Sequence, residues 1–104
     1  MNFNMATPGE ILAILGQRLQ SQRLKLALTQ SDLAARAGLS VGAVRHLERS
    51  GMASMETLVR VVSALGMIEE LQSLFQPKVQ SIAEMTREHD RPRRRAPRVR
   101  KQDN

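Results

Sequence analysis

The chain has 104 residues, 41% of them hydrophobic, and a formal net charge of +6 at pH 7. It contains no cysteine and, apart from Phe3 and Phe75, no aromatic residue of the Phe, Trp or Tyr type, which excludes disulfides, thiolate metal sites and aromatic platforms for stacking single-stranded nucleic acid. No basic leader and no long apolar run opens the chain, so we expect no signal peptide, no membrane span and a cytoplasmic location.

The first expected helix covers residues 8–26 and follows an N-terminal extension, residues 1–7. Thr7 can cap this helix, Pro8 suits its first position, and Glu10 lies where the helix dipole favours a negative charge. The residues expected on its buried stripe are Ile11, Leu12, Leu15, Leu19 and Leu26.

Two shorter helices follow and are joined by a glycine. Thr29 can cap a helix over residues 30–37, and Gly38 can take the left-handed conformation that ends it. Ser40 can cap the next helix, over residues 41–49. The inward positions of the pair are Leu33, Ala34, Ala37, Leu39, Val44 and Leu47. An ordinary helical hairpin is the alternative, but the caps, glycine and spacing together favour a helix-turn-helix, a motif that meets DNA.

Two further helices complete the expected domain, residues 8–76. One covers residues 55–65, capped by Ser54 and stopped by Gly66, and the other covers residues 68–75. The fold class predicted is therefore all-α, with five helices. One small domain does not need all the apolar surface near the end of this set, so we expect a homodimer with contacts from Met67, Ile68, Leu71, Leu74 and Phe75.

Residues 77–89 form a separate segment after the expected domain. Ser81 and Glu84 have the spacing of a capping box, which predicts a short helix to about His89. A helix of this length needs a packing partner, and we expect it to pack on the body or to contribute to dimerisation.

A basic tail, residues 90–104, ends the chain. From residue 87 on, eight Lys or Arg stand against three Asp or Glu, whereas residues 1–86 hold eight against seven. Prolines and the run Arg93, Arg94 and Arg95 cannot bury a core, so the tail is expected to be disordered when free. It can follow DNA or order on a protein partner, and its net charge favours DNA.

A set of short motifs between Leu15 and Phe75 points to one family. The motifs are Leu15-Gly16-Gln17-Arg18-Leu19, Arg23, Leu28-Thr29-Gln30, Leu33-Ala34, Gly38-Leu39-Ser40, Leu47-Glu48-Arg49 and Ser54-Met55-Glu56-Thr57-Leu58. With them the chain resembles the XRE-type (Cro/CI, lambda repressor-like) helix-turn-helix family. It departs from the family pattern after Glu48, where the glycine is shifted to Gly51 and a proline before the fourth helix is absent.

The resemblance implies roles for individual residues. Gln30 would grip the DNA backbone, and the start and outer face of the third helix would read bases. Val41 and Gly42 offer only an apolar contact and an open backbone, so specificity would depend on Arg45, which matches guanine, and on His46. The expected DNA-binding residues are Gln30, Ser40, Val41, Gly42, Arg45, His46 and Arg49, with Arg93, Arg94 and Arg95 of the tail.

Three of these side chains have a plainer alternative. Arg45 and Arg49 lie one turn apart, and they could form a solvated helix face instead of contacting DNA. His46 could equally be a surface histidine without a role. The resemblance also implies that Glu48 is a structural acid, paired with Arg23 or a helix terminus, and not a catalytic one.

The function expected from these features is repression of transcription by a homodimer on a palindromic operator in double-stranded DNA. The stretch from Ser54 to Gly66 is similar to antitoxins paired with HipA-type kinase toxins, which implies a HipB-like antitoxin that represses its own operon. Two alternatives are a stand-alone regulator and a protein-interaction adaptor that no longer recognises DNA bases. No enzyme, cofactor or metal site is expected, because the chain has two histidines, no cysteine and no glycine-rich phosphate loop.

Overall fold

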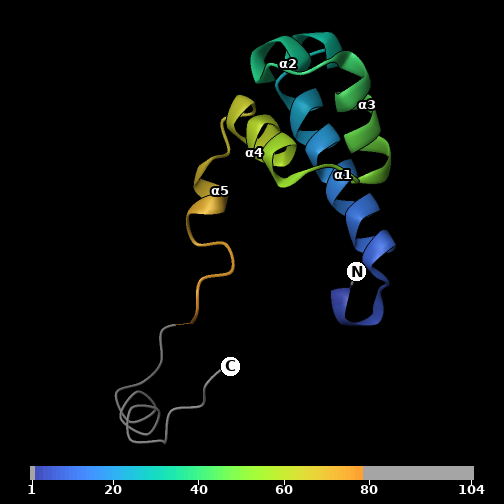
Figure 1. The fold of residues 1–104 in the computed structure, drawn as a ribbon, viewed down its shortest axis with the longest axis vertical. Coiled ribbons are helices and arrows are strands. Elements are labelled where there is room, and N and C mark those ends of the chain that lie inside the picture. The colour runs from blue at the N-terminus through green and yellow to red at the C-terminus, as the bar shows by residue number, and fades with distance from the viewer. Residues whose placement is uncertain (1, 79–104) are drawn as a thin grey trace, which may run out of the picture. The chain divides into compact units, whose positions relative to one another are not determined.

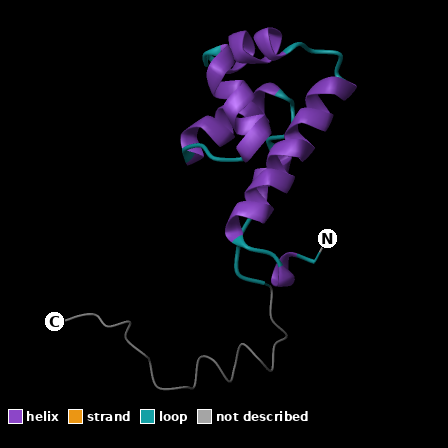
Figure 2. Ribbon diagram, turned by 90° about the vertical axis from the view of Figure 1, so that its right-hand side faces the viewer, coloured by secondary structure: helices purple, strands orange, loops and turns teal. Residues whose placement is uncertain are grey.

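The structure, a computed structural model, describes residues 2–78, and residues 2–74 of these form one compact unit. The described part is helical and contains no strand, as Figures 1 and 2 show, which confirms the all-α class. A short 3-10 helix, Phe3–Met5, precedes α1 (Pro8–Lys25), α2 (Gln30–Ala37), α3 (Val41–Ser50), α4 (Met55–Ala64) and α5 (Glu69–Gln72). None of these helices is long and apolar enough to cross a membrane. The helix expected after residue 80 and the basic tail with Arg93, Arg94 and Arg95 lie outside the described residues.

Each of the first four α-helices begins at the side-chain cap that the sequence predicts. Thr7, Thr29, Ser40 and Ser54 each accept a hydrogen bond from the backbone N–H three residues later, at 2.9–3.1 Å. At the two threonines the bond is reciprocated, because the carboxylate three residues on accepts from the threonine's own N–H. These caps satisfy N–H groups that a helix leaves unpaired at its start, so the helix starts are fixed by local chemistry.

Glycines end the two helices of the central pair. Gly38, after α2, has φ 71°, and Gly51, after α3, has φ 74°. The left-handed conformation strains any residue with a Cβ. A Cβ on Gly51 would also overlap the backbone carbonyl of Leu12 in α1. Gly51 therefore allows both the turn after α3 and the close approach of α1.

The core is aliphatic and is shared by α1 to α4. Leu33, Val44 and Val61 have the largest fully buried side chains. Figure 1 shows α3 alongside α1 and α2 at one end of this pair, in agreement with the contacts α1–α3 and α2–α3, and α4 in turn contacts α2. The buried hydrophobic residues are Leu19, Leu28, Leu33, Ala34, Ala37, Val44, Leu47, Val61, Val62 and Leu65.

The stripe expected on the first helix is wrong in part. Leu12 and Leu15 remain 36% and 38% exposed, and Leu26, which follows the last residue of α1, is 50% exposed. The buried line of α1 includes Gly16 and Arg23 as well as Leu19. The reason is the closeness of α3, since a Cβ on Gly16 would lie 2.5 Å from the carbonyl oxygen of Leu47.

The fifth helix is shorter than the sequence predicts. It has four residues, Glu69–Gln72, instead of covering 68–75. Phe75 has φ 63°, which a right-handed helix cannot contain. Met67 and Leu71 pack partly against the core, whereas Ile68 and Leu74 are 50% and 46% exposed.

Candidate nucleic-acid interface

The outer face of α3 carries four of the seven expected DNA-binding residues that the structure describes. Val44 and Leu47 anchor the opposite face in the core. Two expected residues are less available: Val41 packs partly against the core, and the hydroxyl of Ser40 serves as the cap of α3. The residues exposed on the outer face are Gly42, Arg45, His46 and Arg49.

Arg45 and Arg49 have unused hydrogen-bond donors. Both side chains are exposed, one turn apart, and neither makes a hydrogen bond or ion pair with any other residue among 2–78. A guanidinium offers five N–H groups in a planar fork that matches phosphate oxygens or the edge of guanine. The two arginines can therefore serve an anionic ligand without breaking any existing contact.

His46 is held near the end of α3. The hydroxyl of Ser50 donates to the carbonyl oxygen of His46 at 2.8 Å and lies 3.4 Å from Nε2 of the imidazole. The same hydroxyl accepts from the N–H of Met52 at 3.1 Å. Ser50 thus ties the loop after α3 to the helix and restrains the histidine ring.

A buried ion pair connects α1 and α3. Nε of Arg23 donates to Oε2 of Glu48 at 2.6 Å and Nη2 donates to Oε1 at 3.0 Å, while Nη1 donates to the carbonyl oxygen of Leu28 at 2.8 Å. Both residues are buried, with 7% and 4% of their surface exposed. The bidentate geometry satisfies both charges. The structural role predicted for Glu48 is confirmed.

Gln30 joins this pair from the start of α2. Its Nε2 donates to Oε1 of Glu48 at 3.0 Å, and the side chain is half-buried. An amide group carries two N–H donors. The expected phosphate contact of Gln30 therefore depends on the second hydrogen and on the backbone N–H groups at the start of α2.

A hollow of about 360 Å³ lies over this network, and we call it the notch. It combines side chains from α1, α2 and α3, and includes two glutamines of α1 that sequence reasoning did not assign to the interface. Their spacing of three residues, on the helix that also presents Gly16 and Arg23 to α3, is the signal that could have found them. The notch is lined by Gln17, Gln20, Gln30, Arg45, Glu48 and Arg49.

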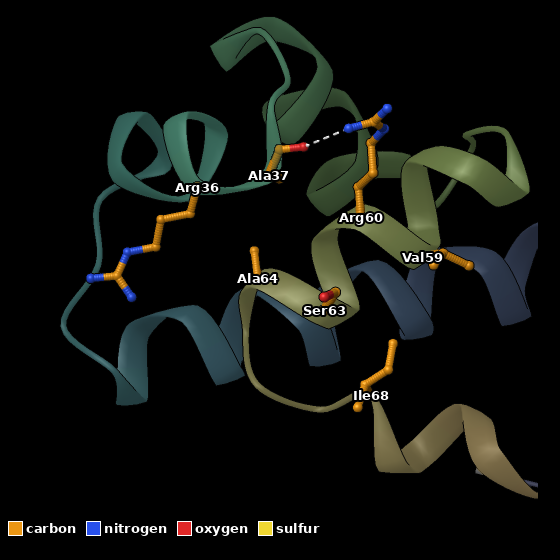
Figure 3. A pocket seen from close by; sticks show the side chains of 7 residues that line it. All are labelled: Arg36, Ala37, Val59, Arg60, Ser63, Ala64 and Ile68. Atoms are coloured by element: carbon orange, nitrogen blue, oxygen red, sulfur yellow. Dashed lines mark hydrogen bonds between the residues drawn. The ribbon is translucent and has the colours of Figure 1, made fainter.

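A second hollow, of about 470 Å³, shares no lining residue with the notch. Figure 3 shows it between α2 and α4, with the guanidinium of Arg60 directed at the carbonyl oxygen of Ala37. Arg60 also pairs with Glu56 at 3.0 Å. Its charge therefore has internal partners, unlike Arg45 and Arg49. Among residues 2–78, no group of three His, Cys, Asp or Glu side chains could hold a metal ion.

Comparison with known protein families finds one match. A family model described as a helix-turn-helix matches residues 19–71, about half of the chain. No curated protein matches the chain significantly. The matched span contains α2, α3 and α4 and every residue of the notch except Gln17.

Proposed function

The chain belongs to the XRE-type helix-turn-helix family of DNA-binding transcription regulators, and we propose that it is a repressor that binds a palindromic double-stranded operator as a homodimer. The observation that carries this proposal is the outer face of α3, where Arg45 and Arg49 are exposed and have no partner within the described residues. In the major groove, a bidentate Arg–guanine pair discriminates against the wrong base by about 1–3 kcal/mol. Arg45 would then specify sequence, and Arg49 would strengthen binding.

Selection of bound sequences from a random DNA pool tests base reading. We expect the wild-type protein to enrich a motif with two inverted half-sites about one helical turn apart. Arg45→Ala should relax the motif at one position of each half-site. A pool that yields no motif would favour the alternative function, a protein-interaction adaptor that no longer recognises DNA bases. Removal of residues 87–104 should lower affinity without changing the motif if the tail contacts only the backbone.

Exposed apolar residues near α5 support dimerisation. Because Met67 and Leu71 already pack partly against their own core, a second copy would meet Ile68 and Leu74 first. Size-exclusion chromatography with light scattering at micromolar concentration, with and without DNA, measures the oligomeric state directly. A strict monomer in both conditions would refute the homodimer.

We further propose an antitoxin role, as the HipB-like repressor of its own operon with a HipA-type kinase toxin as partner. The support is the similarity of the stretch Ser54–Gly66 to antitoxins that are paired with HipA-type kinase toxins. This stretch forms α4 and its C-terminal turn. Co-expression with a neighbouring kinase-like reading frame tests the role, because a cognate toxin should copurify. If no such frame exists and nothing copurifies, the stand-alone regulator is the better description.

A further inference from the structure

We propose that the notch binds a phosphate of the DNA backbone, and that Gln17 and Gln20 of α1 donate hydrogen bonds to it. This inference rests on the proposed DNA-binding function and adds α1 to the elements that grip the duplex. Gln17 precedes the span matched by the family model and Gln20 lies within it, and both are assigned here because they line the notch.

The notch has a net positive charge that is available to a ligand. Its one carboxylate, Glu48, already accepts two hydrogen bonds from Arg23 and one from Gln30. The ion pair offsets the negative charge of Glu48, which leaves the charges of Arg45 and Arg49 uncompensated in the notch. An anion that enters is attracted by two cations and meets no free carboxylate.

Four side chains of the notch hold unused donors. Gln17, Gln20, Arg45 and Arg49 make no hydrogen bond or ion pair with other residues of the described part of the chain. Each amide offers two N–H groups and each guanidinium offers five, whereas the only carboxylate is already engaged. A ligand that satisfies this set must carry several acceptor oxygens and a negative charge, which is the chemistry of a phosphodiester.

The position of the notch fits the backbone of DNA, and the five N–H donors of Arg45 can be shared between a base and this phosphate. Arg45 and Arg49 belong both to the outer face of α3 and to the lining of the notch, so the notch opens beside that face. When a recognition helix enters the major groove, the sugar-phosphate strands that border the groove lie beside the helix. A DNA strand at this position would contact both α3 and the glutamines of α1.

A salt titration of binding tests the inference, with the duplex enriched from the random pool as the probe. We compare the Gln17→Ala/Gln20→Ala double variant with Gln22→Ala, a glutamine of the same helix that does not line the notch. Loss of two hydrogen bonds to a charged phosphate should weaken binding by about a hundredfold or more. The slope of log K against log salt should not change, because a neutral amide releases no counterion. The enriched motif should also stay the same.

A gain-of-function variant provides the second readout. Gln20→Lys places an extra cation in the notch, so binding should tighten and the salt slope should steepen by about 0.9 per phosphate contacted. An unfolded protein cannot produce this gain. The inference is overturned if Gln20→Lys binds like the wild-type protein, or if the double variant binds like Gln22→Ala. A wild-type protein that binds all duplexes equally would instead overturn sequence-specific repression, and the same comparisons with any one duplex would then decide the phosphate site.

Discussion

Replacement of Gly42 by alanine should make the protein more stable and a weaker binder of DNA. Gly42 lies in the first turn of α3, its φ is not positive, and a Cβ there would meet only the hydroxyl oxygen of Ser40, at 3.9 Å. That distance is ordinary van der Waals contact, so alanine fits without strain. Glycine within a helix is less favourable than alanine by about 0.5–1 kcal/mol. For a domain of this size, Gly42→Ala should raise the Tm by about 2–8 °C.

The same open space at Gly42 is where we expect DNA to approach. A methyl group on the outer face of α3 would hold the helix away from the base edges. The resulting weakening of base recognition is comparable to that of a mismatched base pair, about 1–3 kcal/mol. The Kd for the selected duplex should therefore rise about 5- to 150-fold.

Thermal denaturation and a fluorescence-anisotropy titration measure the two effects of Gly42→Ala. The control is Gly9→Ala in α1, where a Cβ would meet no atom within 4 Å. This control should leave DNA affinity unchanged. A lower Tm for Gly42→Ala would show that the space beside α3 is not open, and an unchanged Kd would show that the first turn of α3 does not contact DNA closely.

Three other substitutions test the packing and the caps. Glu48→Ala should lower the free energy of unfolding by about 3–5 kcal/mol, because the buried Arg23 loses its counter-charge; a loss below about 1 kcal/mol in chemical denaturation would contradict this. Gly16→Ala should destabilise the protein by about 1–3 kcal/mol or prevent folding, since the new Cβ would lie 2.5 Å from a backbone oxygen of α3. An unchanged Tm would argue against so close an approach of α1 to α3. Hydrogen bonds from Thr29, first from its backbone N–H and second from its hydroxyl, lower the pKa of Asp32. The Asp32 carboxylate therefore stabilises the fold above the unfolded-state pKa of about 3.9. This contribution disappears as pH falls through the lower folded-state pKa. The difference in unfolding free energy between wild type and Asp32→Asn should therefore shrink between about pH 5 and pH 2; a difference that does not vary with pH would refute the assignment.

The helix starts could be predicted from the sequence because their causes are local. A cap such as Thr29 or Ser54 needs only the chain within the next three residues. The left-handed turn at Gly38 is likewise a property of one residue type. The helix-turn-helix and the exposed Arg45 follow from these signals and from helical spacing.

The remaining features depend on how α1 meets α3, which no local pattern contains. Gly16 is buried because two backbones touch there, and this displaces Leu12 and Leu15 toward the surface. The spacing of Gln17 and Gln20 puts them on one face of α1, but only the assembled helices show that this face lines the notch. The length of α5 also escaped prediction, since apolar spacing does not reveal where one short helix gives way to a turn.

The network of Arg23, Glu48 and Gln30 has a consequence for the thermodynamics of recognition. Its three members come from α1, α3 and α2, so separating any one helix would leave a buried charge or amide without its partner. Local opening of α3 alone should therefore be rare, and its amides should exchange with solvent only in openings close to global unfolding. In the proposed complex, a reading helix restrained in this way would need little rearrangement on binding. It would lose little conformational entropy on binding, and more of the contact energy with DNA would appear as affinity.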